Sequence, residues 1–309
     1  MVGGTGAKVT VGRLMAQAQA ALIDALHLPS GEARIEAQVL LRRALGEVSR
    51  AWLIAHEHDP LATGQQASFR LLLERRLAGE PVAYILGERE FFGLMFKVTS
   101  ATLIPRPETE LLVEMALQRI PSPGLTATLS RSRERGWGRG CVFCVLDLGT
   151  GSGAIALSIA HSRPDVEVVA VDASSEALAV ARENAQRLGV GNAIFVQSDW
   201  YTALGAQRFD LIVSNPPYVV AGDAHLQQGD LRFEPASALA SGGDGLDDIR
   251  RIAEQASAYL VLGGWLLLEH GYDQAARVRE LLQRAGFSEV FSACDLSGIE
   301  RVSAGRVSS

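Results

Sequence analysis

The feature that most constrains the fold is the second half of the chain, where short β-branched apolar segments alternate with segments of helical period. Alternation at this spacing predicts an α/β fold, with a mostly parallel, doubly wound sheet covered by helices on both faces. Strands are expected over residues 142–148, 167–172, 193–199, 209–214 and 264–270, with two shorter ones near 288–293 and 301–304. Helices are expected to about residue 161 and over 174–188, 246–260 and 274–285.

The N-terminal residues have a helical period instead, which predicts a small helical bundle. Thr10 and Ser30 are placed to cap the first two helices, and Gly46 is placed to end the second. The helices are expected over residues 11–26, between Ser30 and Gly46, and over 50–56 and 65–77.

Two stretches of unusual composition divide the chain further. Aromatic and β-branched residues surround Gly93, which favours a β-hairpin. The stretch 121–140 is rich in Pro, Gly, Ser and Arg; it predicts a flexible surface insertion, with a nucleic-acid or ribosome contact as the alternative. We therefore expect a helical bundle over 1–83, a hairpin linker over 84–103 and an α/β domain over 104–309 that contains the insertion.

Composition excludes several classes of protein. The 309 residues carry 29 Lys and Arg against 35 Asp and Glu, a net charge of −6, which disfavours a protein that binds duplex DNA through bulk charge. No apolar run approaches the ~20 residues of a membrane span. Three cysteines (Cys141, Cys144 and Cys294) are too few for a disulfide framework, so we expect a soluble protein of the cytoplasm. No metal site is expected, since His56 and His58 would not share a helix face.

A glycine-rich loop follows the first expected strand of the sheet, with the sequence Asp147-Leu148-Gly149-Thr150-Gly151-Ser152-Gly153-Ala154. Glycines allow a sharp turn and a close ligand, and the helix that follows offers free N–H donors. Asp172 lies 23 residues beyond Gly149, where an acid can bind ribose hydroxyls. The loop satisfies both the dinucleotide fingerprint and the loop of S-adenosylmethionine-dependent methyltransferases, so it predicts an adenosine-bearing ligand without deciding which.

The strand expected over 209–214 ends in the tetrapeptide Asn215-Pro216-Pro217-Tyr218. Carboxyl ends of parallel strands line the ligand crevice, so Asn215 is expected beside the glycine loop. The Asn215 Oδ1 atom and the Pro216 carbonyl could accept two hydrogen bonds from a planar –NH2 group, against which Tyr218 would pack. This arrangement favours methyl transfer to an amide or to an exocyclic amine, and it contains no obvious general base.

These motifs, in this order, resemble the PrmC/HemK protein-glutamine N5-methyltransferases, as do Leu103–Glu110, His225–Pro235 and Glu269-His270-Gly271. The resemblance extends from Thr10 to Arg306, and the 121–140 insertion is its main departure. It implies a class I methyltransferase fold, the cofactor S-adenosyl-L-methionine, and methylation of the glutamine in the Gly-Gly-Gln motif of peptide-chain release factors. We also expect a monomer that binds neither membranes nor specific nucleic-acid sequences.

The resemblance also assigns roles to individual residues. The cofactor would be held by Gly149, Thr150, Gly151, Ser152 and Gly153 at its methionine part, Asp172 at the ribose, Asp199 and Trp200 at the adenine, and Asn215. The substrate glutamine would be held by Asn215, Pro216, Pro217 and Tyr218, with Arg106 and Glu108 near the cleft. Asn215, Pro216 and Tyr218 are the expected catalytic residues, and the helical bundle would help dock the release factor.

Three other functions fit part of the pattern. A nucleic-acid methyltransferase would act on an exocyclic amine, but it would require a basic groove. An enzyme for a ribosomal-protein glutamine is closer, although His225–Pro235 resembles the release-factor branch better. A binding module with an inactive catalytic site is disfavoured, because the glycine loop, Asp172 and Asn215 are all intact.

Overall fold

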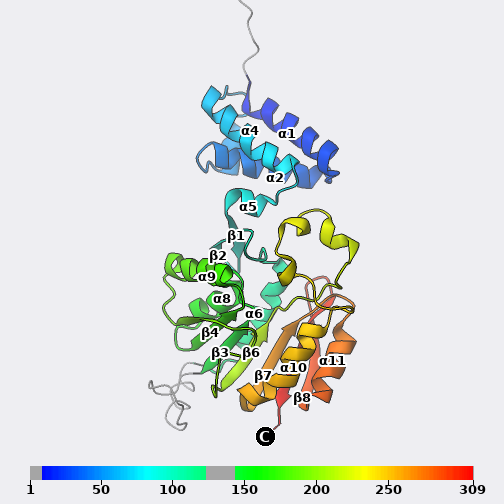
Figure 1. Cartoon of the computed structure of the whole chain (residues 1–309). Helices are drawn as coiled ribbons and strands as arrows, with labels where there is room; N and C mark the ends of the chain where they lie inside the picture. Colours follow the sequence, from blue (N-terminus) through cyan, green and yellow to red (C-terminus); the bar gives the residue numbers. More distant parts are fainter. Residues whose placement is uncertain (1–8, 123–142, 309) are drawn as a thin grey trace, which may run out of the picture. The chain divides into compact units, whose positions relative to one another are not determined.

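The computed structural model describes residues 9–122 and 143–308, and these form two compact units (Figure 1). One unit contains the described residues up to Gly87 together with Gln228–Phe233, and the other contains the rest. The first boundary therefore falls within the expected hairpin linker, and the return of Gln228–Phe233 to the first unit was not expected. The expected insertion lies outside the described residues from position 123 onward, as does Cys141.

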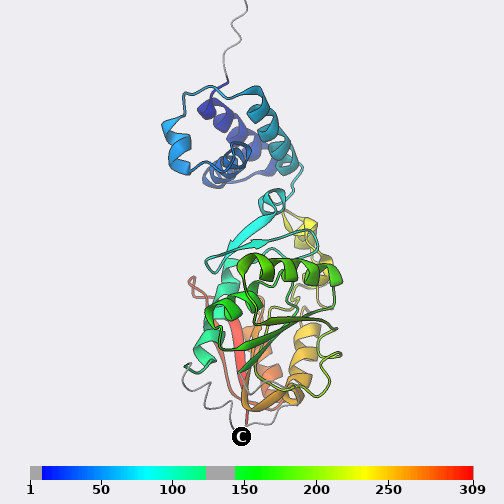
Figure 2. The same cartoon turned by 90° about the vertical axis from the view of Figure 1, so that its left-hand side faces the viewer.

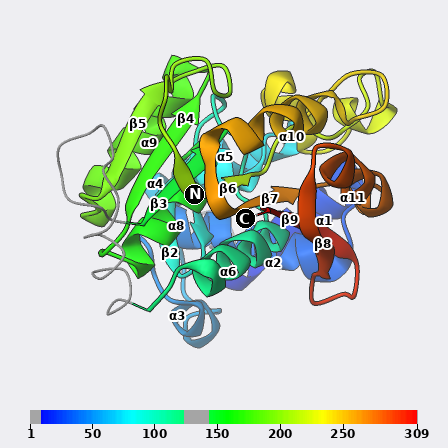
Figure 3. The same ribbon diagram turned by 90° about the horizontal axis from the view of Figure 1, so that it is seen from below.

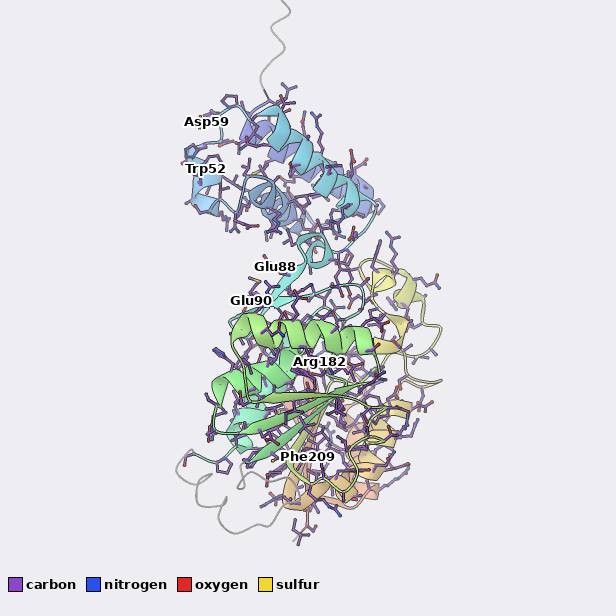
Figure 4. All side chains as sticks on the ribbon, turned by 60° about the vertical axis from the view of Figure 1, so that its left-hand side comes forward. Trp52, Asp59, Glu88, Glu90, Arg182 and Phe209 are labelled. Atoms are coloured by element: carbon purple, nitrogen blue, oxygen red, sulfur yellow. The ribbon has the colours of Figure 1, made fainter. Side chains whose placement is uncertain are left out.

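The first unit is a helical bundle of α1 (Val11–Leu26), α2 (Ser30–Ala44), α3 (Arg50–Ala55), α4 (Thr63–Leu77) and α5 (Val82–Leu86). Its core is apolar, with Leu22, Leu40, Leu41 and Phe69 fully buried. Trp52, which lies on α3 (Figure 4), stacks on the C-cap residue His56 with ring centroids 4.1 Å apart. The short helix α5 was not predicted, because five residues between Pro81 and Gly87 contain too little periodicity to recognise.

The predicted caps of the first two helices had different outcomes. The Thr10 hydroxyl accepts a hydrogen bond from the Arg13 N–H at 3.3 Å, so the predicted cap of α1 is confirmed. The prediction for Ser30 was wrong, because Pro29 is the N-cap residue and Ser30 is the first helical residue. The Ser30 hydroxyl instead accepts from Gln19 Nε2 at 3.0 Å, a contact between helices that local sequence does not reveal.

A buried arginine holds the returning segment to the bundle. Arg76, only 4% exposed, donates to both carboxylate oxygens of Glu36 at 2.8 and 3.0 Å and to Asp230 Oδ1 at 2.9 Å. A buried guanidinium must be paired, so the two carboxylates offset its lost hydration. Segment 228–233 is thereby part of the first unit although it is distant in sequence.

The second unit is built on a seven-stranded sheet in the order β5-β4-β3-β6-β7-β9-β8 (Figure 3). Its strands are β3 (Cys144–Leu148), β4 (Glu167–Asp172), β5 (Ala193–Gln197), β6 (Phe209–Ser214), β7 (Leu260–Glu269), β8 (Phe287–Cys294) and β9 (Glu300–Val307). The first five are parallel, and β9 runs antiparallel to β7 and β8. The order reverses at β3 and β6, the switch point where ligands bind in open α/β sheets.

Helices cover both faces of this sheet, so the predicted doubly wound class is confirmed. Side chains alternate along β3: Val145 joins the core with α6 (Glu110–Arg119), α8 (Ala154–Ser162) and α9 (Ser175–Leu188), whereas Leu146 and Leu148 join the core with α10 (Asp247–Tyr259) and α11 (Ala275–Arg284). Phe209, which begins β6, is buried in the core that contains α10 and α11 (Figure 4). Short 3-10 turns complete the unit at Pro107–Thr109, Ala224–Gln227 and Ala236–Ala238; another, Leu231–Phe233, belongs to the first unit.

The predicted hairpin consists of β1 (Glu88–Phe91) and β2 (Leu94–Lys97), which pair antiparallel and lie beside α9 (Figure 2). Phe91 and Phe96 are buried in the core shared with α6 and α8. The Lys97 N–H donates to Asn184 Oδ1 at 2.7 Å, and Asn184 Nδ2 donates back to the Lys97 carbonyl at 3.0 Å. The hairpin is therefore packed into the second unit. No helix among the described residues is long and apolar enough to cross a membrane.

Candidate active site

The second unit contains a cavity of about 600 Å³ at the carboxyl ends of β3, β4 and β6. This volume is in the usual range for sites that bind small molecules and cofactors. The cavity is lined by the glycine loop, the ends of three strands, the 100–106 segment, Thr109, the turn after Glu234 and two residues of α10. Asn215 thus lies in the same cavity as the glycine loop, as expected.

The glycine loop exposes backbone to this cavity. Gly149, Gly151 and Gly153 have positive φ angles of 73°, 55° and 83°, which side-chain-bearing residues adopt only with strain. A Cβ at Gly151 would meet nothing within 4 Å, so the loop has open space on its outer side. The Asp147 carboxylate stabilises the loop because it accepts a hydrogen bond from the Thr150 hydroxyl at 2.7 Å. Burial raises the pKa of Asp147 to about 7, against the lowering effect of that hydrogen bond.

Asp172 ends β4 and lines the cavity. Its Oδ2 accepts from the Gly151 N–H at 2.8 Å, and its Oδ1 accepts from the Ser174 N–H at 2.9 Å. Burial raises the pKa of Asp172, whereas these backbone donors favour its ionised form. Each oxygen has taken one donor and can accept another, so the carboxylate can receive two adjacent hydroxyl groups.

Trp200 and Asp199 form the next part of the wall. Trp200 has a φ of +49°, and its ring is 3.5 Å from where a Gly149 Cβ would stand. Asp199 is exposed and forms a bidentate ion pair with Arg251, with N–O distances of 2.9 and 2.7 Å. Arg251 lines the cavity from α10 but was not predicted, because only the fold brings α10 next to residue 199.

The tetrapeptide directly follows β6, whose last residue is fixed by the Ser214 hydroxyl donating to the Leu148 carbonyl at 2.7 Å. Asn215 and Pro217 line the cavity, and Asn215 Nδ2 donates to Thr109 Oγ1 at 3.2 Å. Pro216 is buried and Tyr218 half-buried; neither is among the described residues that line the cavity. The Tyr218 carbonyl accepts from Gln274 Nε2 at 2.9 Å, which anchors the end of the turn.

The two residues assigned near the cleft differ in position. Arg106 lines the cavity and is paired with Glu234, whose other oxygen accepts from the Ile104 N–H at 3.2 Å. Glu108 is exposed and is not among the cavity-lining residues of the described chain. Glu234 belongs to the segment that carried the family resemblance, so that motif was a signal for this buried carboxylate.

Another buried carboxylate, Glu269, follows Leu268, which pairs with Ser214 directly before the tetrapeptide. It ends β7 and is 2% exposed. Burial raises its pKa to about 7, although the nearby Thr109 and Tyr218 hydroxyls lower it. Its Oε2 atom is buried and has no hydrogen-bond partner among the described residues. Sequence reasoning quoted Glu269 in a motif without giving it a role, and it did not name Thr109 as a site residue.

Comparisons with known proteins bear on both units. A family model described as "PrmC N-terminal domain" matches residues 13–87, and one described as "Methyltransferase small domain" matches 142–246. The release factor glutamine methyltransferase of Bordetella pertussis is 51% identical over 285 residues, 92% of this chain and 98% of the relative. That of Escherichia coli K12 is 44% identical over 273 residues, 88% and 92% of the two chains.

The chain belongs to the release factor glutamine methyltransferase family. This membership confirms the predicted family, the methyltransferase class and the cofactor S-adenosyl-L-methionine, and it excludes the dinucleotide interpretation of the glycine loop. The hMettl16 catalytic domain, solved with a MAT2A 3'UTR hairpin, is 17% identical and covers 76% of this chain and 81% of its own, with a TM-score of 0.52. That likeness shows that this family member has a class I methyltransferase fold.

Proposed function

We propose that this chain transfers a methyl group from S-adenosyl-L-methionine to the side-chain nitrogen of a release-factor glutamine, the one in the Gly-Gly-Gln motif. The observation that carries this proposal is the shared cavity: Asn215 and Pro217 lie in the same space as the glycine loop and Asp172. A methyl donor and an amide acceptor held there would be adjacent, and the relatives described above act on release-factor glutamine by name.

The residues present fit the cofactor. The Asp172 carboxylate keeps a free acceptor site on each oxygen for the two ribose hydroxyls. Open space at Gly151 would admit the methionine part beside Gly149, Thr150, Ser152 and Gly153, and Asp199 with Trp200 would border the adenine. When bound, the cofactor supplies an electrophilic methyl group on a positively charged sulfur.

The tetrapeptide would hold and activate the acceptor. An amide nitrogen is a weak nucleophile because its lone pair is conjugated with the carbonyl. The Asn215 Oδ1 atom and the Pro216 carbonyl would accept its two N–H bonds, orient the lone pair and stabilise the positive charge that develops on nitrogen. Tyr218 would pack near the acceptor and exclude water. One N–H proton then leaves the nitrogen, so no strong base is required before the transfer.

The first unit would help dock the protein substrate. Its match to the PrmC N-terminal domain supports this role. We infer that the chain acts as a monomer in the cytoplasm, where release factors are made and used.

The test uses the purified protein with labelled S-adenosyl-L-methionine and four separate acceptors: unmethylated release factor, its Gln→Ala variant, ribosomal proteins and total RNA. We expect one methyl mass increment on the Gly-Gly-Gln peptide and none on the variant. Label on a ribosomal protein or on RNA, with release factor unmodified, would refute the substrate but retain the methyltransferase.

A further inference from the structure

The tetrapeptide has few backbone groups of its own with which to be held in place. Pro216 and Pro217 have no N–H, and all four residues lie beyond the end of β6, outside the ladder of the sheet. Ser214, directly before the tetrapeptide, is fixed by its bond to the Leu148 carbonyl. The other end of the tetrapeptide must be held by contacts with other segments.

The peptide group between Tyr218 and Val219 makes those contacts on both of its edges. The Tyr218 carbonyl accepts from Gln274 Nε2 at 2.9 Å, and the Val219 N–H donates to the Leu239 carbonyl at 2.9 Å. A peptide group is planar, so two bonds on opposite edges fix its orientation. The plane includes the Cα of Tyr218, from which the ring extends, so the position of that ring depends on both bonds.

The orientation of the Gln274 amide is determined by two backbone groups. Its Oε1 accepts from the Gly271 N–H at 2.8 Å, while its Nε2 donates to the Tyr218 carbonyl. A backbone N–H can only donate and a carbonyl can only accept, so turning the amide by a half-turn would lose both bonds. Gln274 is 6% exposed, so a lost bond would leave a buried polar group unpaired. Gly271 of the motif Glu269-His270-Gly271 thereby gains a role.

Gly245 provides the space in which this amide meets the carbonyl. It has a φ of +75° and stands directly before Leu246, the N-cap residue of α10. A Cβ at position 245 would lie 2.4 Å from the Tyr218 carbonyl oxygen and 2.8 Å from Gln274 Nε2. Real Cβ atoms do not come so close to other atoms, so a side chain there would displace the hydrogen bond.

We propose that Gln274 is a positioning residue for methyl transfer, which fixes the Tyr218 end of the tetrapeptide against the acceptor amide in the space that Gly245 leaves open. This inference rests on the proposed function, since that function assigns Tyr218 to the acceptor. Within the described chain, neither Gln274 nor Gly245 lines the cavity. Their loss should therefore lower turnover and leave the affinity for S-adenosyl-L-methionine unchanged.

The first test replaces Gln274 by Met, which has a similar length but neither the donor nor the acceptor. We expect kcat with full-length release factor to fall by about tenfold, because small displacements of a positioning group are costly in turnover. Calorimetry should show unchanged affinity for S-adenosyl-L-methionine.

Asn192→Leu is the matched control, since it also removes a side-chain amide that binds backbone. Asn192 Nδ2 donates at 3.1, 3.2 and 3.0 Å to three carbonyls, those of Ala160, Arg163 and Val166, and none of these residues lines the cavity. This variant should lose stability toward urea but keep its kcat. The kinetic comparison is made at a temperature at which both variants are folded.

The second test adds a methyl group at Gly245. Gly245→Ala should lower kcat by about tenfold, whereas Gly298→Ala should not, because Gly298 has a similar φ of +79° but its Cβ would meet nothing within 4 Å. Gly245→Ala and Gln274→Met break the same hydrogen bond, so the double variant should lose no more turnover than the more affected single variant.

Three results would overturn the inference. They are losses of kcat that multiply in the double variant, a kcat for Gln274→Met equal to that of Asn192→Leu, and an equal loss of cofactor affinity and turnover in Gln274→Met. Failure of the wild-type enzyme to methylate release factor would instead refute the proposed function.

Discussion

Asn215 has the largest predicted effect of any single residue, because it is the side chain that would contact the reacting nitrogen. Substitution to Ala removes one of the two proposed amide acceptors and should lower turnover by ~10² or more. The affinity for S-adenosyl-L-methionine should change little, which calorimetry with the purified variant would measure. Equal losses of cofactor affinity and turnover would place Asn215 in the cofactor site instead.

Asp172 should show the opposite pattern. Its carboxylate is fixed by the Gly151 and Ser174 N–H groups, and it would accept the ribose hydroxyls. Asp172→Ala should weaken binding of S-adenosyl-L-methionine by about 10- to 100-fold, the usual cost of losing hydrogen bonds to a charged group. Asp273→Ala, which removes an exposed carboxylate, serves as the control. Unchanged calorimetric affinity in Asp172→Ala would remove the assignment.

At the scale of elements, the turn from β3 into α8 depends on glycine for two separate reasons. Gly153 has a φ of +83°, and a Cβ there would lie 2.9 Å from Leu157 Cδ1. Gly189, which ends α9, also has a positive φ of 67°, but a Cβ there would meet nothing within 4 Å. The two positions separate backbone strain from steric overlap.

Gly153→Ala should therefore lower the free energy of unfolding by about 1–3 kcal/mol more than Gly189→Ala does, since it adds overpacking to the shared strain. Urea denaturation of the two variants without cofactor measures the difference. Equal losses would mean that the contact between Gly153 and α8 relaxes without cost.

At the scale of the whole molecule, buried carboxyl groups make stability depend on pH. Burial raises the pKa of Asp147 from 3.8 to about 7. Between these values the folded chain binds a proton that the unfolded chain has released, so this group stabilises the fold below about pH 4 and loses that contribution as pH rises through 7. Glu269 has the same sign, since its pKa is raised from 4.5 to about 7.

Asp147→Asn cannot titrate, so its free energy of unfolding should fall less steeply between pH 4 and 7 than that of the wild type. The difference in slope should approach about 1.4 kcal/mol per pH unit at most, the value for one proton. The contribution of Glu269 is common to both proteins and cancels. Parallel curves from denaturation across this range would contradict the raised pKa of Asp147.

The sequence by itself determined the fold class, the cofactor loop and the family. Alternating strand and helix periods predict a doubly wound sheet because each element buries one face, and that pattern is local. The predicted strand 209–214 agrees with β6 residue for residue. The glycine loop and the tetrapeptide are each a contiguous motif in the sequence. Both directly follow strands that are predicted to be parallel, so the sequence places them at the same edge of the sheet.

Only the tertiary structure decided which distant residues support these motifs. Thr109, Glu234, Arg251 and Glu269 come from four separated segments, and no periodicity links them to the cavity. The wrong prediction for Ser30 has the same cause, because its hydroxyl accepts a hydrogen bond from Gln19 on another helix. The position of segment 228–233 was also not predictable, because it depends on the ion pair between Arg76 and Asp230. Local patterns record which backbone a segment prefers, whereas hydrogen bonds between side chains far apart in sequence form only when the packed fold brings their donors and acceptors together.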